Sequence, residues 1–279
     1  ENFITNGANV TVTGTVLDET ATTLTVNGSA TSVGSGGAFS RQVALAEGMN
    51  TITVVATDAR NNSSTVTRHV RRDSQAPALT VSTPADGFIT NQTPITVSGS
   101  VLDSTQKTLT VNGTSLTLGA GGTFSGQIAL AEGANTLTFV ATDQAGNSTT
   151  LVRNGSLDAQ APTITITSPG EGLITNQPSV SMSGSVSDGT TVTLTINGIN
   201  VPVQSDGSFN TPVQLIEGPN AIIVAATDAA GNTTTLTRHA RLDTQPPVIV
   251  VSQPSGRVVT NQASFDVAGT VSDSTVTVV

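Results

Sequence analysis

The sequence predicts an all-β protein made of tandem copies of one β-sandwich. Three observations predict it: a block of sequence returns every 85 residues, apolar residues alternate with Ser and Thr inside each block, and turn-forming residues separate the alternating runs. The chain has 279 residues, which is enough for two to three domains of ordinary size. We therefore expect several small cores rather than one large core.

The repeat is clearest in a tetrapeptide that ends in Thr-Asn. Phe3–Asn6 returns at 88–91, 173–176 and 258–261, so the interval is 85 residues each time. Other features keep this offset without a gap: Val26–Gly28 matches Val111–Gly113 and Ile196–Gly198, and Phe39 matches Phe124 and Phe209. Such constant register indicates one structural unit copied head to tail.

Within one copy the hydrophobic period is two residues, which is typical of strands with one buried face. In the second copy this pattern predicts seven short strands, A to G, marked in order by Leu79 and Val81, Ile95 and Val97, Leu109 and Val111, Leu116 and Leu118, Phe124, Ile128 and Leu130, Leu137, Phe139 and Ala141, and Leu151. Seven strands in about 85 residues is the number found in a two-sheet sandwich.

The turns between these strands carry residues that tolerate a positive φ. Asn112-Gly113 is a strong hairpin signal and is expected to join strands C and D, with Asn27-Gly28 and Asn197-Gly198 doing so in the other copies. Gly146 occupies the turn between strands F and G, where the first copy has Asn61.

Three linkers of the form Asp-x-Gln-x-Pro divide the chain, at 73–77, 158–162 and 243–247. Proline just after a linker suits the start of an edge strand. The predicted domains are therefore residues 1–74, a repeat that lacks strand A; residues 75–159 and 160–244, two complete repeats; and residues 245–279, a partial repeat with strands A to C.

Composition excludes several classes of function. Ten basic against 19 acidic residues give a formal charge of −9, which disfavours nucleic acid and anionic lipid as partners. Cys, Trp and Tyr are absent and aromatic residues make up 3%, so the usual platforms for sugars and bases are scarce. No apolar run approaches 18 residues, so we expect no membrane insertion.

Candidate catalytic residues are also scarce, and we predict that the chain is not an enzyme and has no catalytic residues. His69 and His239 occupy equivalent positions but the second copy has Asn154 there, which favours a solvated strand face over a shared catalytic or metal role. The glutamates that recur before Gly between strands E and F, with no second carboxylate at that end of the sandwich, favour a turn or rim role; they are Glu47, Glu132 and Glu217.

The residues of the second copy resemble the bacterial immunoglobulin-like domains. The run Ala141–Asn147, with Asn135, Gly122–Ser125 and Glu132-Gly133 before it and Ala161-Pro162 after it, carries the resemblance, which extends over essentially the whole chain. Such domains occur in giant adhesins, biofilm proteins and accessory modules of secreted glycosidases. The resemblance implies tandem immunoglobulin-like seven-strand β-sandwiches with an 85-residue repeat, and a bacterial extracellular or cell-surface location.

Aspartates are the polar residues that recur with the repeat. They follow strand B at Asp18, Asp103, Asp188 and Asp273, follow strand F at Asp58, Asp143 and Asp228, and open the linkers at Asp73, Asp158 and Asp243. In a seven-strand sandwich the B–C and F–G loops lie at the end where strand A begins, which is the end that meets the preceding linker.

We therefore expect the aspartates to meet in threes, one from each linker and two from the following repeat. The expected sets are Asp73 with Asp103 and Asp143, and Asp158 with Asp188 and Asp228. Oxygen-only clusters of carboxylates suit calcium, and the resemblance implies calcium at domain junctions of some adhesins. The alternative is that each aspartate only caps the backbone of its own turn.

These features predict a non-enzymatic structural or adhesive segment, acting as a calcium-stiffened stalk or fibre whose partners are neighbouring repeats. One alternative is a binding module, either an adhesin tip or a carbohydrate-binding accessory domain. Another is the protomer of an extracellular filament, in which a copy of the chain donates the terminal segment 245–279 to the open first repeat in a head-to-tail fibre. Truncation of a longer array would give the same incomplete ends.

Overall fold

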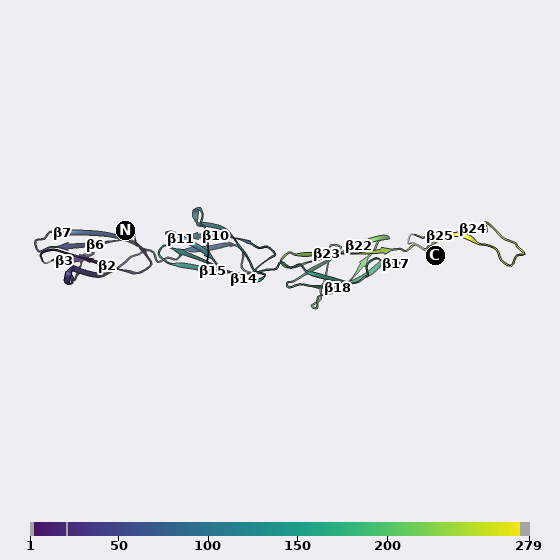
Figure 1. Cartoon of the computed structure of the whole chain (residues 1–279), viewed down its shortest axis with the longest axis horizontal. Helices are drawn as coiled ribbons and strands as arrows, with labels where there is room; N and C mark the ends of the chain where they lie inside the picture. The colour runs from purple at the N-terminus through teal and green to yellow at the C-terminus, as the bar shows by residue number, and fades with distance from the viewer. Residues whose placement is uncertain (1–2, 21, 274–279) are drawn as a thin grey trace. The chain divides into compact units, whose positions relative to one another are not determined.

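The computed structural model describes residues 3–20 and 22–273, whose regular secondary structure is β-strand apart from two short 3₁₀ turns (Figure 1). Contacts between Cα atoms divide the chain into two compact units. One unit comprises Glu1–Phe88 with Thr93–Ser156, and the other comprises Ile89–Gln92 with Leu157–Val279. The strands of each repeat are described below in chain order.

The first repeat forms two sheets. Its strands are β1 (Phe3–Thr5), β2 (Asn9–Thr15), β3 (Thr23–Val26), β4 (Ser29–Thr31), β5 (Ala38–Ala44), β6 (Gly48–Thr57) and β7 (Ser63–Arg72). One sheet has the order β1-β7-β6-β3-β4, and the other pairs β2 with β5. A short 3₁₀ turn, Ser35–Gly37, precedes β5.

The second repeat has the same plan with one strand more in the smaller sheet. Its strands are β8 (Ala78–Thr83), β9 (Phe88–Thr90), β10 (Ile95–Leu102), β11 (Lys107–Val111), β12 (Thr114–Leu116), β13 (Thr123–Ile128), β14 (Gly133–Asp143) and β15 (Ser148–Leu157). The sheets have the orders β13-β10-β8 and β12-β11-β14-β15-β9. The 3₁₀ turn Ala120–Gly122 again precedes the strand that carries Phe124.

The third repeat copies the second, and a further strand pair follows it. The strands are β16 (Thr163–Ser168), β17 (Leu173–Thr175), β18 (Ser179–Ser187), β19 (Thr193–Ile196), β20 (Ile199–Val201), β21 (Ser208–Gln214), β22 (Gly218–Thr227), β23 (Thr233–Leu242), β24 (Val248–Gln253) and β25 (Ala268–Ser272). The sheets are β16-β18-β21, β17-β23-β22-β19-β20 and β24-β25. The strand C that the sequence predicts for the last segment lies outside the described residues.

The prediction of tandem immunoglobulin-like sandwiches is confirmed, because each complete repeat packs an A-B-E sheet against a sheet of strands C, D, F and G. The structure adds a short eighth strand that the sequence analysis missed. This strand pairs in parallel with the last strand of its repeat, as in β1 with β7 (Phe3↔Val70) and β17 with β23 (Leu173↔Ala240). Three residues are too few to show an alternating pattern. The domain boundaries stay predictions.

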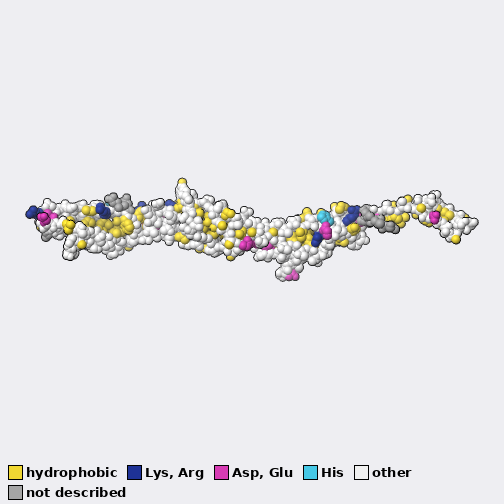
Figure 2. Space-filling model, viewed as in Figure 1, with side chains coloured by type: hydrophobic (Ala, Val, Ile, Leu, Met, Phe, Trp, Pro, Cys, Tyr) yellow, Lys and Arg dark blue, Asp and Glu magenta, His cyan; other side chains and the backbone are white. Residues whose placement is uncertain are grey.

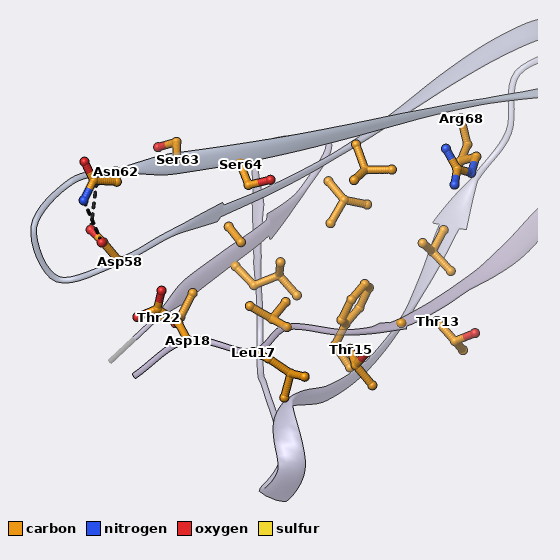
Figure 3. A pocket seen from close by; sticks show the side chains of 18 residues that line it. Thr13, Thr15, Leu17, Asp18, Thr22, Asp58, Asn62, Ser63, Ser64 and Arg68 are labelled. Carbon is orange, nitrogen blue, oxygen red and sulfur yellow. Dashed lines mark hydrogen bonds between the residues drawn. The ribbon is translucent and has the colours of Figure 1, made fainter. Parts of the chain in front are cut away.

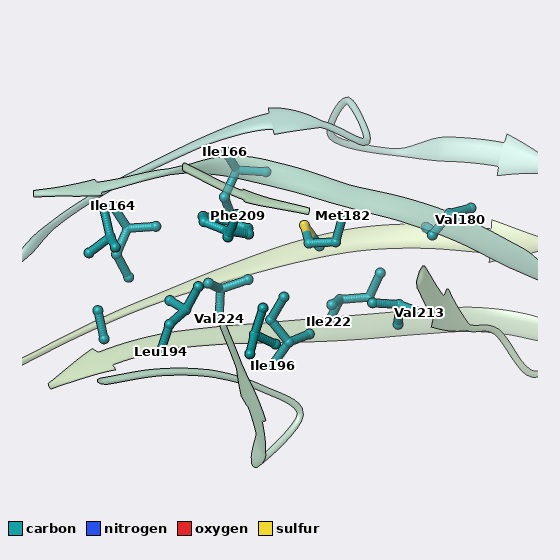
Figure 4. Packing of buried hydrophobic residues seen from close by; sticks show 14 of the residues in the cluster. Ile164, Ile166, Val180, Met182, Leu194, Ile196, Phe209, Val213, Ile222 and Val224 are labelled. Atoms are coloured by element: carbon teal, nitrogen blue, oxygen red, sulfur yellow. The ribbon is translucent and has the colours of Figure 1, made fainter. Parts of the chain in front are cut away.

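Each sandwich is closed by apolar side chains from its two sheets. In the third repeat, Figure 4 shows Ile164, Ile166 and Met182 on one layer facing Leu194 and Val224 on the other. Met182 and Val224 are completely buried. The alternation predicted from the sequence therefore reflects one buried face per strand, as expected for a sandwich.

The turns follow the predicted chemistry. The Asn of each C–D hairpin has φ between 47° and 49°, and the following Gly has φ between 76° and 80°, which are the values of a type I′ turn; the pairs are Asn27-Gly28, Asn112-Gly113 and Asn197-Gly198. The Asn side chain adds a bond that the pattern does not reveal, because Asn112 Oδ1 accepts the Thr138 amide at 2.8 Å. The F–G turn has positive φ at Asn61 and Gly146, as predicted.

We predict that Phe124→Ala removes about 3 to 5 kcal/mol from the free energy of unfolding of the second repeat, because it leaves a cavity. Phe124 is 4% exposed and its ring centroid lies 6.3 Å from that of Phe139. Denaturant unfolding measures the loss, and Leu102→Ala, at a side chain that is 57% exposed, is the control. Equal losses in the two variants would contradict this assignment of the core.

Candidate metal sites at the linkers

The first aspartate cluster consists of Asp73, Asp103 and Asp143. Asp73 directly follows β7, Asp103 directly follows β10, and Asp143 is the last residue of β14. Each contributes one carboxylate oxygen, and these three oxygens lie within 4.8 Å of one another. Asp73 and Asp143 are buried and Asp103 is half-buried. The structure thus brings the linker aspartate onto the loops of the following repeat.

The second aspartate cluster has the same design one repeat later. Asp158 directly follows β15, Asp188 directly follows β18, and Asp228 directly follows β22. Their carboxylate oxygens also lie within 4.8 Å of one another, with Asp158 and Asp228 buried. These three residues all belong to the unit that contains the third repeat.

The other four aspartates do not join a group of three acidic or histidine side chains among the residues that the structure describes. Asp18 is exposed and Asp58 is half-buried, and both residues line a groove of the first repeat that is described below. Asp243 follows the last strand of the third repeat and Asp273 follows β25. Metal binding at these four positions stays a prediction without a cluster to support it.

The B–C aspartates Asp18, Asp103 and Asp188 each cap their own turn, as the alternative interpretation expected. Asp103 Oδ1 accepts the Thr105 amide at 2.6 Å and the Thr105 hydroxyl at 2.7 Å. Asp18 does the same with Thr20 in the first repeat, at 2.7 Å and 2.6 Å. The aspartate therefore caps its turn whether or not a linker aspartate lies beside it. At Asp103 the cap uses Oδ1, and Oδ2 takes no part in it.

The F–G turn holds the linker through an asparagine that sequence reasoning missed. Asn147 donates its backbone amide to Asp143 Oδ1 and its Nδ2 to Asp143 Oδ2, both at 2.8 Å. The same Nδ2 lies 2.7 Å from the Asp73 carbonyl oxygen and 3.2 Å from that of Gln75. In the next repeat Asn232 repeats these bonds with the carbonyls of Asp158 and Gln160, at 2.8 Å and 3.0 Å.

A signal for this asparagine is present in the sequence, because Asn62, Asn147 and Asn232 recur at 85-residue spacing directly after the positive-φ residue of the turn. In the first repeat Asn62 still binds Asp58, as Figure 3 shows, with Nδ2 2.8 Å from Oδ2. The side-chain and then the backbone hydrogen bond of Asn62 outweigh desolvation and lower the pKa of Asp58. At Asp228 burial raises the pKa, but the bonds from Asn232 and neighbouring amides lower it overall.

The glutamate of the E–F turn binds the linker that follows its own repeat. Glu47 accepts the Ser74 hydroxyl at 2.8 Å and the Ser74 amide at 3.1 Å, and Glu217 accepts the Thr244 hydroxyl at 2.8 Å. The Ser74 side chain, its amide and the nearby Arg72 lower the pKa of Glu47. The sequence predicts a turn or rim role for these glutamates, and the structure adds the linker as their partner.

The first repeat contains an open groove of about 540 Å³ between β2 and β7, lined by residues such as Gly14, Phe39, Val66 and Arg68 (Figure 3). In the second repeat β8 occupies the equivalent place: a Cβ added to Gly99 would lie 2.0 Å from the Thr80 carbonyl oxygen. A Cβ added to Gly14 would meet only the Phe39 ring. The groove therefore lies against β2 where β8 lies against β10 in the second repeat.

The two histidines make different contacts. His239 Nδ1 lies 2.7 Å from Glu171 Oε1, whereas His69 Nδ1 lies 3.3 Å from the Thr51 hydroxyl, and these histidines lie on exposed strand faces. On the visible face in Figure 2, Lys and Arg side chains are few and separated from one another. No helix within the described part of the chain is long and apolar enough to cross a membrane.

Curated relatives are much longer than this chain. Bacillopeptidase F of Bacillus subtilis (strain 168) is 33% identical over 182 residues, which are 63% of this chain and 13% of the relative. The PII-type proteinase of Lacticaseibacillus paracasei is 30% identical over 266 residues, which are 83% of this chain and 14% of the relative. The chain thus spans about one seventh of the relatives it matches.

The fold is shared with a solved I-band fragment I67–I69 from titin, with a TM-score of 0.50 and 8% identity over 87% of this chain and 95% of the fragment. The family model described as glucodextranase, domain B, matches three times, at residues 1–74, 77–158 and 162–244. The resemblance to tandem bacterial immunoglobulin-like domains is thereby confirmed. Since these three matches together cover most of the sequence, the chain belongs to the glucodextranase domain B family.

Proposed function

We propose that this chain is a non-enzymatic spacer segment of a bacterial extracellular or cell-surface protein, and that calcium at its linkers stiffens it. The observation that carries the proposal is the recurring placement of one linker aspartate within 4.8 Å of two loop aspartates of the following repeat. A stalk gains length by adding repeats, and it gains stiffness only if each linker is held against a neighbouring repeat.

The relatives favour a spacer over an independent protein. This chain matches 13% to 14% of the length of proteins named as proteinases, which suits an accessory region beside a catalytic domain. Its sandwiches resemble a titin fragment in fold. The scarcity of aromatic residues argues against a carbohydrate-binding accessory module.

The donor atoms of the clusters suit calcium. Calcium binds carboxylate, carbonyl and water oxygens at 2.3 to 2.6 Å, so two ligands on opposite sides of the ion are separated by roughly 4.6 to 5.2 Å. Three carboxylate oxygens that all lie within 4.8 Å of one another are close enough to bind one such ion. Without a cation, three carboxylates repel one another, and an ion would turn this repulsion into an attraction that holds the linker.

Removal of calcium is predicted to loosen the linkers without unfolding the sandwiches. Small-angle scattering with excess chelator should then show greater flexibility and a shorter mean maximum dimension than with millimolar calcium, the range in which extracellular modules commonly bind. Asp18→Asn, outside both clusters, should respond to calcium like the unmodified chain. Scattering and melting temperature that do not change with calcium would leave turn formation as the whole role of the aspartates.

The asparagine in the F–G turn is predicted to stiffen the linker independently of metal. Asn147→Ala removes the side-chain bond to Asp143 and the bonds to the linker carbonyls, whereas Asn62→Ala removes only the corresponding side-chain bond to Asp58. At about 1 kcal/mol for each lost bond, Asn147→Ala should destabilise its repeat by 1 to 2 kcal/mol more than Asn62→Ala. Trypsin should cleave faster after Arg72 in Asn147→Ala; equal rates in the two variants would contradict the linker role.

A further inference from the structure

The two aspartate clusters have the same carboxylates but different neighbours. At the first cluster Ser104 donates its hydroxyl to Asp73 Oδ2 at 3.1 Å. The Ser104 oxygen in turn accepts a hydrogen bond from Arg71 Nη2 at 2.9 Å. The linker carboxylate of the first cluster therefore has a protein donor, and that donor is connected to a guanidinium.

Neither partner has a counterpart at the second cluster. With the 85-residue offset, Gly189 takes the position of Ser104, and Ser156 takes the position of Arg71. Asp158 is 8% exposed, and its Oδ2 atom is buried without a hydrogen-bond partner among the described residues. A buried carboxylate oxygen with no donor is costly, so this atom requires a partner that the described residues do not supply.

The charged residues near the two clusters also differ. Lys107 lies directly opposite Asp143 in the register of β11 and β14, and Val192 takes this position in the third repeat. At the first cluster Lys107 thus lies opposite Asp143 and Arg71 is hydrogen-bonded to Ser104, whereas both equivalent positions of the second cluster hold uncharged residues. The first cluster therefore has cationic residues nearby that the second cluster lacks.

We propose that the second cluster, Asp158 with Asp188 and Asp228, is the calcium site of this chain, and that the first is closed by Ser104, Arg71 and Lys107 and binds no ion. This inference rests on the proposed function and assigns its metal to one linker. The hydroxyl and the cations of the first cluster take the place that the ion takes at the second. One linker is then stiff at all calcium concentrations and the other only when calcium is present.

Calorimetric titration of the full chain with calcium chloride tests the assignment. One ion should bind at the clusters per chain. Asp158→Asn should weaken this binding at least tenfold, whereas Asp73→Asn should leave it unchanged within twofold. The reverse ranking of these two variants would overturn the proposal.

Exchanging the residues beside the two clusters should weaken calcium binding at the second cluster and create it at the first. Gly189→Ser should weaken calcium binding at least tenfold, because the new hydroxyl can donate to Asp158 as Ser104 does to Asp73. No atom lies within 4 Å of a Cβ built at Gly189, so the variant should fold normally, which its melting temperature in chelator checks. The double variant Arg71→Ser with Ser104→Gly should gain a second site per chain.

The outcomes separate this inference from the proposed function. Two sites of similar affinity in the unmodified chain would overturn the assignment to one linker and leave calcium stiffening intact. Unchanged binding in Gly189→Ser, or no second site in the double variant, would contradict the role given to Ser104 and Arg71. No binding heat and no calcium-dependent melting temperature at millimolar calcium would refute both proposals.

Discussion

The linker after a repeat's last strand must satisfy its backbone carbonyls and its aspartate, and the chemistry of the linker depends on this constraint. The amide of Asn147 provides donors for the carbonyls of Asp73 and Gln75 while it is itself held by Asp143. A buried carbonyl without a donor costs free energy comparable to a lost hydrogen bond. The F–G turn is therefore both a turn and the docking point of the linker, and the aspartates gather there as a consequence.

Much of this organisation could be predicted from the sequence because it is local or repeated. The type I′ hairpins follow from Asn-Gly alone, and the sandwich follows from alternation and strand number. The proximity of Asp158, Asp188 and Asp228 follows from strand topology, since the B–C and F–G loops and the start of strand A share one end of the sandwich.

The features that the sequence did not reveal depend on contacts between distant residues. The short strand β17 has too few residues for a pattern and is defined by its parallel pairing with β23. The bond from Ser74 to Glu47 joins residues 27 apart, and the second repeat has Ala159 in place of Ser74. In the sequence, the difference between Ser104 and Gly189 is an ordinary variation in a turn. It matters in the structure because the buried Asp158 Oδ2 has no donor among the described residues.

The proposed function is one of spacing, in which small sandwiches supply length and the proposed calcium chemistry is concentrated at the linkers. A crystal structure of the chain grown with calcium, examined by anomalous scattering, tests this account most directly. The account predicts one anomalous peak among Asp158, Asp188 and Asp228, with oxygen ligands at about 2.4 Å. An ordered third repeat with water at this position, or a peak at Asp73, Asp103 and Asp143 instead, would contradict it.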